Sequence, residues 1–169
     1  MTIDARAFRQ TVGQFATGVA IVTMEIDGTV RGLTVNSFTA VSLDPPLVLF
    51  CVGKATKTGQ VIHTVQGFAV NILRQDQQDL STYFAGGWTH PLPPSFTFLG
   101  WDGGPRLEGC AAAIGCATDT IYEGGDHWIV IGRVLALHLT SCKTPLVFHG
   151  SRYANLGATF EREILVSGF

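Results

Sequence analysis

Small polar side chains crowd one half of an otherwise apolar stretch, residues 32–52. They are Thr34, Asn36, Ser37, Thr39 and Ser42, and the uninterrupted apolar run 47–52 follows the turn signal Asp44-Pro45-Pro46. A plain core strand needs few such groups, whereas a strand edge that holds a flat polar heterocycle needs several. Backbone groups beside Asn36 and Ser37 can bond such a ring, with Phe38 or Phe50 near its face. The alternative is a strand end with turn-forming Asn and Ser.

A second candidate is the segment from Gly53 to Gly59, which carries Ala55, Thr56, Lys57 and Thr58. It follows an apolar run and is predicted to open a helix, so free N–H groups, hydroxyls and ammonium groups there suit a phosphate. The alternative is a solvated helix start capped by threonine. No glycine stands five residues before Gly53, and no two glycines lie two positions apart. A P-loop and a Rossmann fingerprint are therefore excluded.

The third candidate is His127, in the sequence Gly125-Asp126-His127. A histidine that follows a glycine-rich turn can point into a cleft and bind a carboxamide or assist proton transfer. The alternative is a histidine that is satisfied by its neighbour Asp126. No persuasive Ser-His-Asp or Cys-His arrangement accompanies it.

The fourth candidate is the run 148–153, where Phe148, Arg152 and Tyr153 bring two aromatic rings beside a guanidinium. That combination suits stacking on a ring and contact with phosphate. Ordinary aromatic packing in a closing strand is the alternative, favoured for Phe148.

The elements that would position these residues are mostly strands. Helices are predicted from Asp4, with Phe8, Val12 and Phe15 on one face and Gly18 at the end, and over 56–65 and 75–85. The helix 75–85 should bury Leu80, Tyr83 and Phe84. Strands are predicted over 19–26, 30–34, 47–52, 68–73, 109–121, 127–139 and 146–149, with a hairpin turn at 27–28 and a loop over 86–95. Many strands joined by tight turns favour an antiparallel barrel with a few short helices.

Composition is consistent with one globular domain over 1–169. The net charge is −2, so the sequence shows no basic surface of the kind that binds nucleic acid. Charged residues make up only 14% of the chain, and a homo-oligomer with an apolar interface would explain this low fraction. No targeting segment or membrane span is visible, which favours the cytoplasm. The histidines lack zinc-ligand spacing, so we expect no metal. The cysteines are expected to be reduced, with the second and third in one strand: Cys51, Cys110, Cys116 and Cys142.

These landmarks, in this order, resemble the flavin reductase family, the small reductase components of two-component flavin monooxygenases. The resemblance spans nearly the whole chain. It rests on the segments 8–19, 32–46, 70–73, 84–86, 125–127, 132–134 and 145–153. One departure is that the family often has Gly where this chain has Ser151, with Gly150 one position earlier.

The resemblance implies an FMN-binding split β-barrel, a Greek-key antiparallel barrel, that forms homodimers and uses NADH or NADPH to reduce FAD or FMN. It implies that phosphate lies at Thr56, Lys57 and Thr58, and that His127 and Tyr153 lie at the nicotinamide, with His127 as the candidate catalytic residue. The cofactor-binding candidates are Thr34, Val35, Asn36, Ser37, Cys51, Val52, Ala55, Thr56, Lys57, Thr58, Phe84, Ala85, His127, Arg152 and Tyr153.

The functional hypothesis is therefore an NAD(P)H:flavin oxidoreductase that supplies reduced flavin, by diffusion, to a separate oxygenase. Hydride transfer mainly needs positioning, which fits a site poor in acids and bases. The alternatives are a non-enzymatic flavin carrier or sensor, and a pyridoxamine-phosphate-oxidase-like enzyme that binds FMN. The latter should carry more basic phosphate ligands than this chain does.

Overall fold

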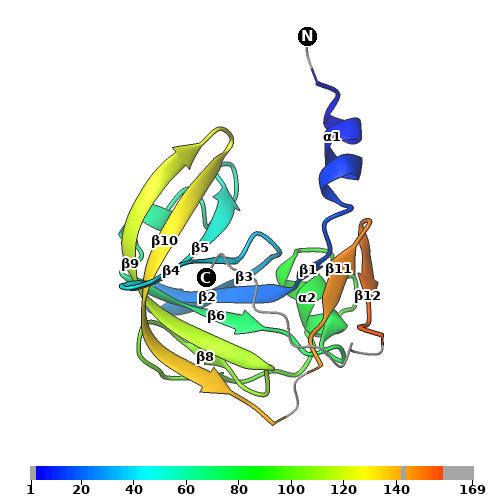
Figure 1. Cartoon of the computed structure of the whole chain (residues 1–169). Coiled ribbons are helices and arrows are strands. Elements are labelled where there is room, and N and C mark those ends of the chain that lie inside the picture. Colours follow the sequence, from blue (N-terminus) through cyan, green and yellow to red (C-terminus); the bar gives the residue numbers. More distant parts are fainter. Residues whose placement is uncertain (1–2, 142–143, 158–169) are drawn as a thin grey trace.

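The computed structural model describes residues 3–141 and 144–157. Strands dominate the described chain, and helices are few (Figure 1). In chain order the elements are α1 (Ala5–Val12), β1 (Thr17–Gly18), β2 (Ala20–Ile26), β3 (Thr29–Val35), β4 (Thr39–Leu43), β5 (Pro46–Gly53), a 3₁₀ turn η1 (Ile62–Thr64), β6 (Gly67–Ile72), α2 (Gln78–Phe84), β7 (Phe98–Leu99), β8 (Arg106–Leu107), β9 (Ala112–Gly124), β10 (His127–Leu139), β11 (Val147–His149) and β12 (Arg152–Ala154).

The main sheet has seven strands in the order β3-β2-β6-β9-β10-β5-β4, and every neighbouring pair is antiparallel. Two-residue turns build its hairpins. Asp27 and Gly28 both have positive φ, 51° and 71°, which is the backbone that a tight hairpin turn requires. Gly124 and His127 are paired at the β9–β10 hairpin, with Gly125 and Asp126 between them.

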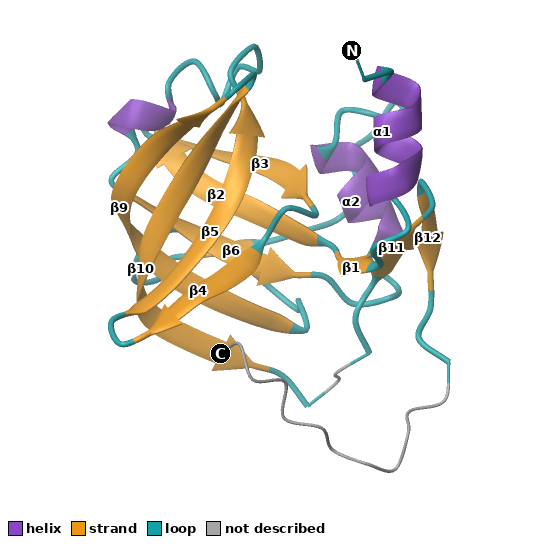
Figure 2. Ribbon diagram, turned by 45° about the horizontal axis from the view of Figure 1, so that its top comes forward, coloured by secondary structure: helices purple, strands orange, loops and turns teal. Residues whose placement is uncertain are grey.

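The two edge strands of this sheet, β3 and β4, are consecutive in the chain. Only residues 36–38 separate them, so the end of β3 and the start of β4 can lie no farther apart than about 14 Å. The sheet must therefore curl until these ends of its two edge strands approach each other, as Figure 2 shows. The short connection between the two edges contains Asn36 and Ser37. These two candidate ligand-binding residues therefore lie at the gap between β3 and β4, which we call the split of the barrel.

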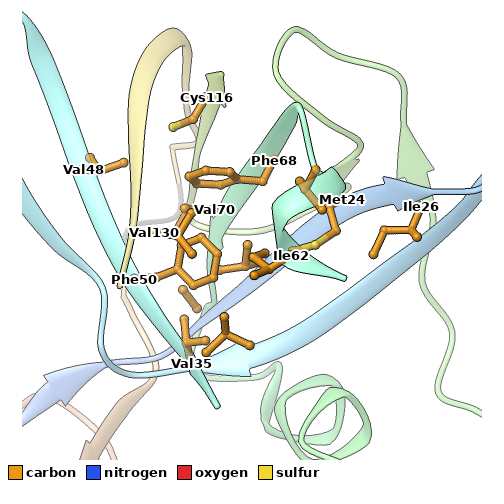
Figure 3. Packing of buried hydrophobic residues seen from close by; sticks show 14 residues of the cluster. Met24, Ile26, Val35, Val48, Phe50, Ile62, Phe68, Val70, Cys116 and Val130 are labelled. Carbon is orange, nitrogen blue, oxygen red and sulfur yellow. The ribbon is translucent and has the colours of Figure 1, made fainter. Parts of the chain in front are cut away.

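One hydrophobic core fills the inside of the curled sheet (Figure 3). Phe50 and Phe68 meet edge to face in it with ring centroids 5.0 Å apart. On β5 the buried residues Val48, Phe50 and Val52 alternate with partly exposed ones. The inward row therefore makes the core, and the residues between them face outward.

A second, smaller cluster lies outside the barrel, where α2 packs against the three-stranded sheet β1-β11-β12. Its buried members are Val19, Ile21, Leu73, Leu80, Leu107 and Leu146. Phe84, Phe96, Phe98, Phe148 and Tyr153 pack against it. This cluster fixes α2, which forms one side of the site.

The helix predictions were partly wrong. The first helix starts at its predicted cap, where the Asp4 carboxylate accepts from the N–H groups of Arg6 and Ala7, but it stops at Val12 rather than near Gly18. Thr17–Gly18 instead pairs with β11. The third helix is shorter than 75–85, and of its expected buried side Leu80 is buried while Tyr83 and Phe84 are half-buried.

The helix predicted over 56–65 is absent, and turns followed by the single turn η1 take its place. The cause is local. The Thr56 hydroxyl donates to the Gly53 carbonyl at 2.8 Å and accepts from the Gly59 N–H at 2.9 Å, so the side chain competes with helical backbone bonding.

The strand predictions hold, mostly within two residues. Strand 127–139 is confirmed with its predicted bounds, whereas the strand predicted over 109–121 begins at Ala112 and reaches Gly124. Cys110 therefore precedes β9, and the expectation that it shares a strand with Cys116 was wrong. Both thiols are free and buried, and burial raises the pKa of Cys116 to about 12. Cys142 lies outside the described residues.

The expected fold class, mostly antiparallel β with few short helices, is confirmed. Within residues 3–141 and 144–157, no helix is both long and apolar enough to span a bilayer. The same residues contain no group of three or more His, Cys, Asp or Glu placed to hold a metal ion.

Candidate functional site

A pocket of about 590 Å³ lies at the split of the barrel. Most of the residues singled out from the sequence line it, although they come from four separate stretches of the chain. The lining residues are Gly32, Leu33, Thr34, Val35, Asn36, Ser37, Cys51, Val52, Gly53, Thr56, Lys57, Thr58, Phe84, Ala85, Gly86 and His127. The fold thus brings together the polar stretch 32–37, the end of β5 with its following loop, the end of α2 and the start of β10.

Ser37 holds the split of the barrel together. Its hydroxyl oxygen accepts from the Cys51 N–H at 2.9 Å and donates to the Cys51 carbonyl at 3.4 Å. The side chain therefore extends the β4–β5 pairing beyond Thr39, where backbone pairing begins. Asn36, by contrast, is exposed, and no hydrogen bond of its side chain is found among the described residues. Its amide is available to a ligand, whereas the Ser37 hydroxyl is engaged in the fold.

Thr34 is also engaged in the fold. Its hydroxyl donates to the Ser81 carbonyl at 2.7 Å, which ties β3 to α2. Ser81 in turn lies with its hydroxyl oxygen 2.8 Å from that of Tyr153. A hydrogen-bonded chain therefore links β3, α2 and β12, and what Thr34 can offer a flat ligand is its backbone.

The side of the pocket at α2 is aromatic and depends on a glycine. A Cβ on Gly32 would lie 2.7 Å from two ring atoms of Phe84. The Phe84 ring therefore lies directly on the β3 backbone, a close approach that glycine permits. It presents an apolar surface at the pocket, next to Ala85 and Gly86.

The loop after β5 offers donors for an anion. Within the described chain, no hydrogen bond engages the backbone N–H groups of Lys57 and Thr58, and no acidic side chain pairs with Lys57. Lys54 differs, because its Nζ lies 3.5 Å from Glu123 and 4.4 Å from the centre of the Trp128 ring. The predicted helix dipole is missing, so turn N–H groups and the Lys57 ammonium provide the attraction instead.

His127 stands at the other side of this loop. Its Nδ1 lies 2.7 Å from Oδ1 of Asp126, and its Nε2 lies over Gly53, where an added Cβ would be 3.7 Å away. The hydrogen bond to His127 is the main cause of a lowered pKa for the Asp126 carboxyl, with charges on His127 and Lys54 adding to it. Asp126 is thus an ionised acceptor beside the ring.

Three of the fifteen cofactor-binding candidates do not line this pocket, and neither do Phe38 and Phe50, one of which was expected near the face of the ring. Tyr153 lines an adjoining pocket of about 170 Å³, which shares Thr34, Val35, Asn36 and Ala85 with the larger one. Ala55 and Arg152 line neither, and both are exposed. His127 and Tyr153 therefore belong to different pockets on either side of the 34–36 segment.

The sequence did not reveal two glycines that shape the site through their backbone, or one buried serine. Gly32 and Gly59 allow close backbone approaches, since a Cβ on Gly59 would lie 2.1 Å from the Gly53 carbonyl oxygen. Ser81 is fully buried and joins Thr34 to Tyr153. Gly32 follows Arg31 and Gly59 follows Thr58, so neither glycine ends an apolar run, and nothing local marks Ser81.

The residues present fit a flavin nucleotide. The pocket has a flat aromatic side at Phe84, exposed backbone and a free amide at 34–36, and unpaired N–H groups with one unpaired ammonium in the loop at 57–58. A heterocycle needs the first two features and its phosphate needs the third. The hydroxyls of Thr34, Ser37 and Thr56 are already hydrogen-bonded within the protein. They therefore support the walls of the pocket and do not bind the ligand.

Comparison with known proteins agrees with this geometry. Residues 12–157 match the flavin reductase like domain. The reductase subunit HsaB of a flavin-dependent monooxygenase from Rhodococcus jostii (strain RHA1) is 38% identical over 158 residues, covering 91% of this chain and 79% of the relative. The NADH-dependent FAD reductase of Streptomyces globisporus is 37% identical over 155 residues, covering 89% and 85%.

Solved structures give the same result. The flavin reductase PheA2 in its native state superposes with a TM-score of 0.87 at 38% identity, covering 92% of this chain and all of that one. The NADH:FAD oxidoreductase SgcE6 of Streptomyces globisporus, in complex with NAD and FAD fragments, superposes with a TM-score of 0.81 at 34% identity, covering 93% and 97%. Fold and site thus define a flavin-dependent oxidoreductase. The chain belongs to the flavin reductase like domain family.

Proposed function

We propose that this protein is an NADH-dependent flavin reductase that reduces FAD or FMN and supplies the reduced flavin to a separate oxygenase. The observation that carries the proposal is the pocket at the barrel split, where an aromatic side, free amide and backbone groups and an unpaired lysine converge. The relatives support it, since they include a NADH-dependent FAD reductase and a reductase subunit of a flavin-dependent monooxygenase.

The chemistry that the bound groups supply is hydride transfer from the nicotinamide C4 to the flavin N5. The protein's part is to place two planar rings face to face and to keep them there, because proximity and orientation account for much of the rate of such a step. No acid or base of this chain has to act on the hydride itself.

Each side of the pocket binds a different part of the flavin or the nicotinamide. Backbone at 34–36 and the Asn36 amide bind the polar edge of the flavin, and Phe84 contacts its ring system. Lys57 and Thr58 bind phosphate. His127 binds and orients the nicotinamide from the far side of the loop. These assignments rest on which groups are free in the pocket and which are already paired.

The decisive experiment measures NADH and NADPH oxidation with FAD, FMN and riboflavin after bound flavin has been stripped. We expect turnover with a nucleotide flavin well above the reaction of flavin and NADH alone. Flavin binding without turnover would indicate a carrier or sensor. His127→Ala should raise the KM for NADH and slow flavin reduction in stopped flow, while flavin affinity stays nearly unchanged.

The protein is expected to act as a homodimer. The face of α1 that carries Phe8 and Val12 is exposed at 56% and 51%, and the following Phe15 at 80%. An eight-residue helix with no buried residue is marginal alone, and in Figure 1 α1 extends away from the barrel. A second copy is the partner that would cover it. A monomer in light scattering at micromolar concentration would contradict this. A cytoplasmic location likewise stays a prediction.

A further inference from the structure

The Asp126–His127 pair determines which ring nitrogen of His127 meets a ligand. Asp126 is ionised, and a carboxylate can only accept hydrogen bonds. Its Oδ1 lies 2.7 Å from Nδ1 of His127, so Nδ1 must carry the proton. In a neutral imidazole the other nitrogen, Nε2, is then an acceptor with a free lone pair.

The direction of that lone pair follows from the fold. Gly53 and His127 are paired across β5 and β10, and both line the large pocket. Nε2 lies on the Gly53 side, whereas Nδ1 is turned outward to Asp126. No hydrogen bond to Nε2 is found within the described residues. With the imidazole neutral, the pocket therefore meets an acceptor at this position, which calls for an N–H donor on the ligand.

We propose that Asp126 is a positioning residue that holds His127 in the tautomer whose Nε2 accepts the carboxamide N–H of the nicotinamide. This inference rests on the proposed function. It assigns Asp126 a role through His127 and not through contact with the dinucleotide. The Asp126 side chain is 94% exposed, so its bond to His127 contributes little to folding, and its loss should leave a folded protein.

Charged residues near Asp126 provide matched control variants. Lys54 donates its backbone N–H to the Asp126 carbonyl at 2.9 Å, and its ammonium pairs with Glu123 on the same hairpin. Glu123→Ala therefore removes a negative charge from this hairpin without touching the His127 ring. Asp126→Asn removes the charge, and its amide can donate to Nδ1 as well as accept from it, so it no longer fixes the tautomer. Asp126→Ala removes the charge and every hydrogen-bonding atom.

The experiment measures kcat/KM for NADH and for 3-acetylpyridine adenine dinucleotide (reduced), whose ring substituent has no N–H donor. Loss of one hydrogen bond predicts that Asp126→Ala lowers kcat/KM for NADH about 3- to 10-fold. For the acetylpyridine analogue the same variant should change the value less than about twofold, because that analogue cannot make the bond. Asp126→Asn should also lower kcat/KM for NADH more than for the analogue, whereas Glu123→Ala should stay within about twofold for both.

A second readout does not depend on turnover. The ¹⁵N chemical shifts of the His127 ring should show the proton on Nδ1 in the unmodified protein and in Glu123→Ala, and a shift toward the Nε2-protonated form in Asp126→Asn and Asp126→Ala. The inference is overturned if Asp126→Ala lowers kcat/KM equally for both dinucleotides, if it has no effect on NADH, or if the ring shifts are unchanged. An unmodified protein that binds flavin but never oxidises NADH would instead overturn the proposed function.

Discussion

The hydroxyl oxygens of Ser81 and Tyr153 lie 2.8 Å apart and join α2 to β12. Ser81 is fully buried, and Tyr153 borders the smaller pocket. Tyr153→Phe leaves the buried Ser81 hydroxyl without this partner, which should lower the free energy of unfolding by about 1–3 kcal/mol. For a chain of this size we expect a fall in Tm of roughly 2–4 °C per kcal/mol. Thermal or urea unfolding measures it.

A double-mutant cycle isolates this contact. If the bond is the cause, Ser81→Ala with Tyr153→Phe should be less destabilising than the sum of the two single changes, because each removes the same interaction. Strict additivity would mean that the two hydroxyls do not support each other.

Gly32 and Phe84 make the second testable contact. Gly32→Ala places a Cβ 2.7 Å from the Phe84 ring and 3.3 Å from Ile21, so the ring must move. Since this ring is one side of the pocket, we expect flavin affinity to fall about tenfold, a change of about 1.4 kcal/mol. Fluorescence titration with FMN measures the affinity. The control is Gly28→Ala, at a glycine with open space around it, which should affect stability only. Unchanged affinity in Gly32→Ala would mean that the ring does not contact the flavin.

Much of the fold was predictable because hydrophobic alternation and hairpin glycines are local signals. Strand 127–139 follows directly from its apolar run after the turn at Gly125. The prediction of a helix over 56–65 was wrong because the Thr56 side chain bonds two groups of its own loop, and residue types alone do not reveal such bonds. The short strand β4 was missed because none of its residues is buried, so no core-facing apolar row marks it.

The site was predictable in part for a different reason. Residues 34–37, 51–52, 56–58, 84–85 and 127 were singled out from the sequence, and the structure places them around one pocket. Their polar types suggested ligand contact, but side-chain type does not reveal whether a hydroxyl is already paired. Thr34, Ser37 and Thr56 are paired within the protein. Tyr153 and Arg152 were separated from the pocket by the path of β12.

The turn between β11 and β12 gives a stability prediction. His149 and Arg152 are paired, so the loop has two residues, and both have positive φ: 55° for Gly150 and 64° for Ser151. A non-glycine residue in this region costs about 1–2 kcal/mol, partly offset by the greater freedom of glycine in the unfolded chain. Ser151→Gly should therefore raise stability by roughly 0.5–1 kcal/mol. Gly150→Ala should lower it. A Tm for Ser151→Gly below that of the unmodified protein would contradict the strain argument.

Variants of two lysines in one loop distinguish phosphate binding from a general effect of charge. Lys57 lines the pocket and has no acidic partner in the described chain, whereas Lys54 is held by Glu123 and lies over the Trp128 ring. Lys57→Glu should weaken FMN and FAD by about one to two decades, since hydrogen bonds to charged groups contribute about 1.5–3 kcal/mol. Riboflavin has no phosphate, so its dissociation constant should change about twofold at most. Lys54→Glu brings the same charge change to the same loop but should not distinguish FMN from riboflavin. Equilibrium titrations of all three flavins against both variants measure these dissociation constants. The phosphate binds elsewhere if Lys57→Glu weakens riboflavin as much as FMN, or if Lys54→Glu weakens FMN relative to riboflavin as much as Lys57→Glu does.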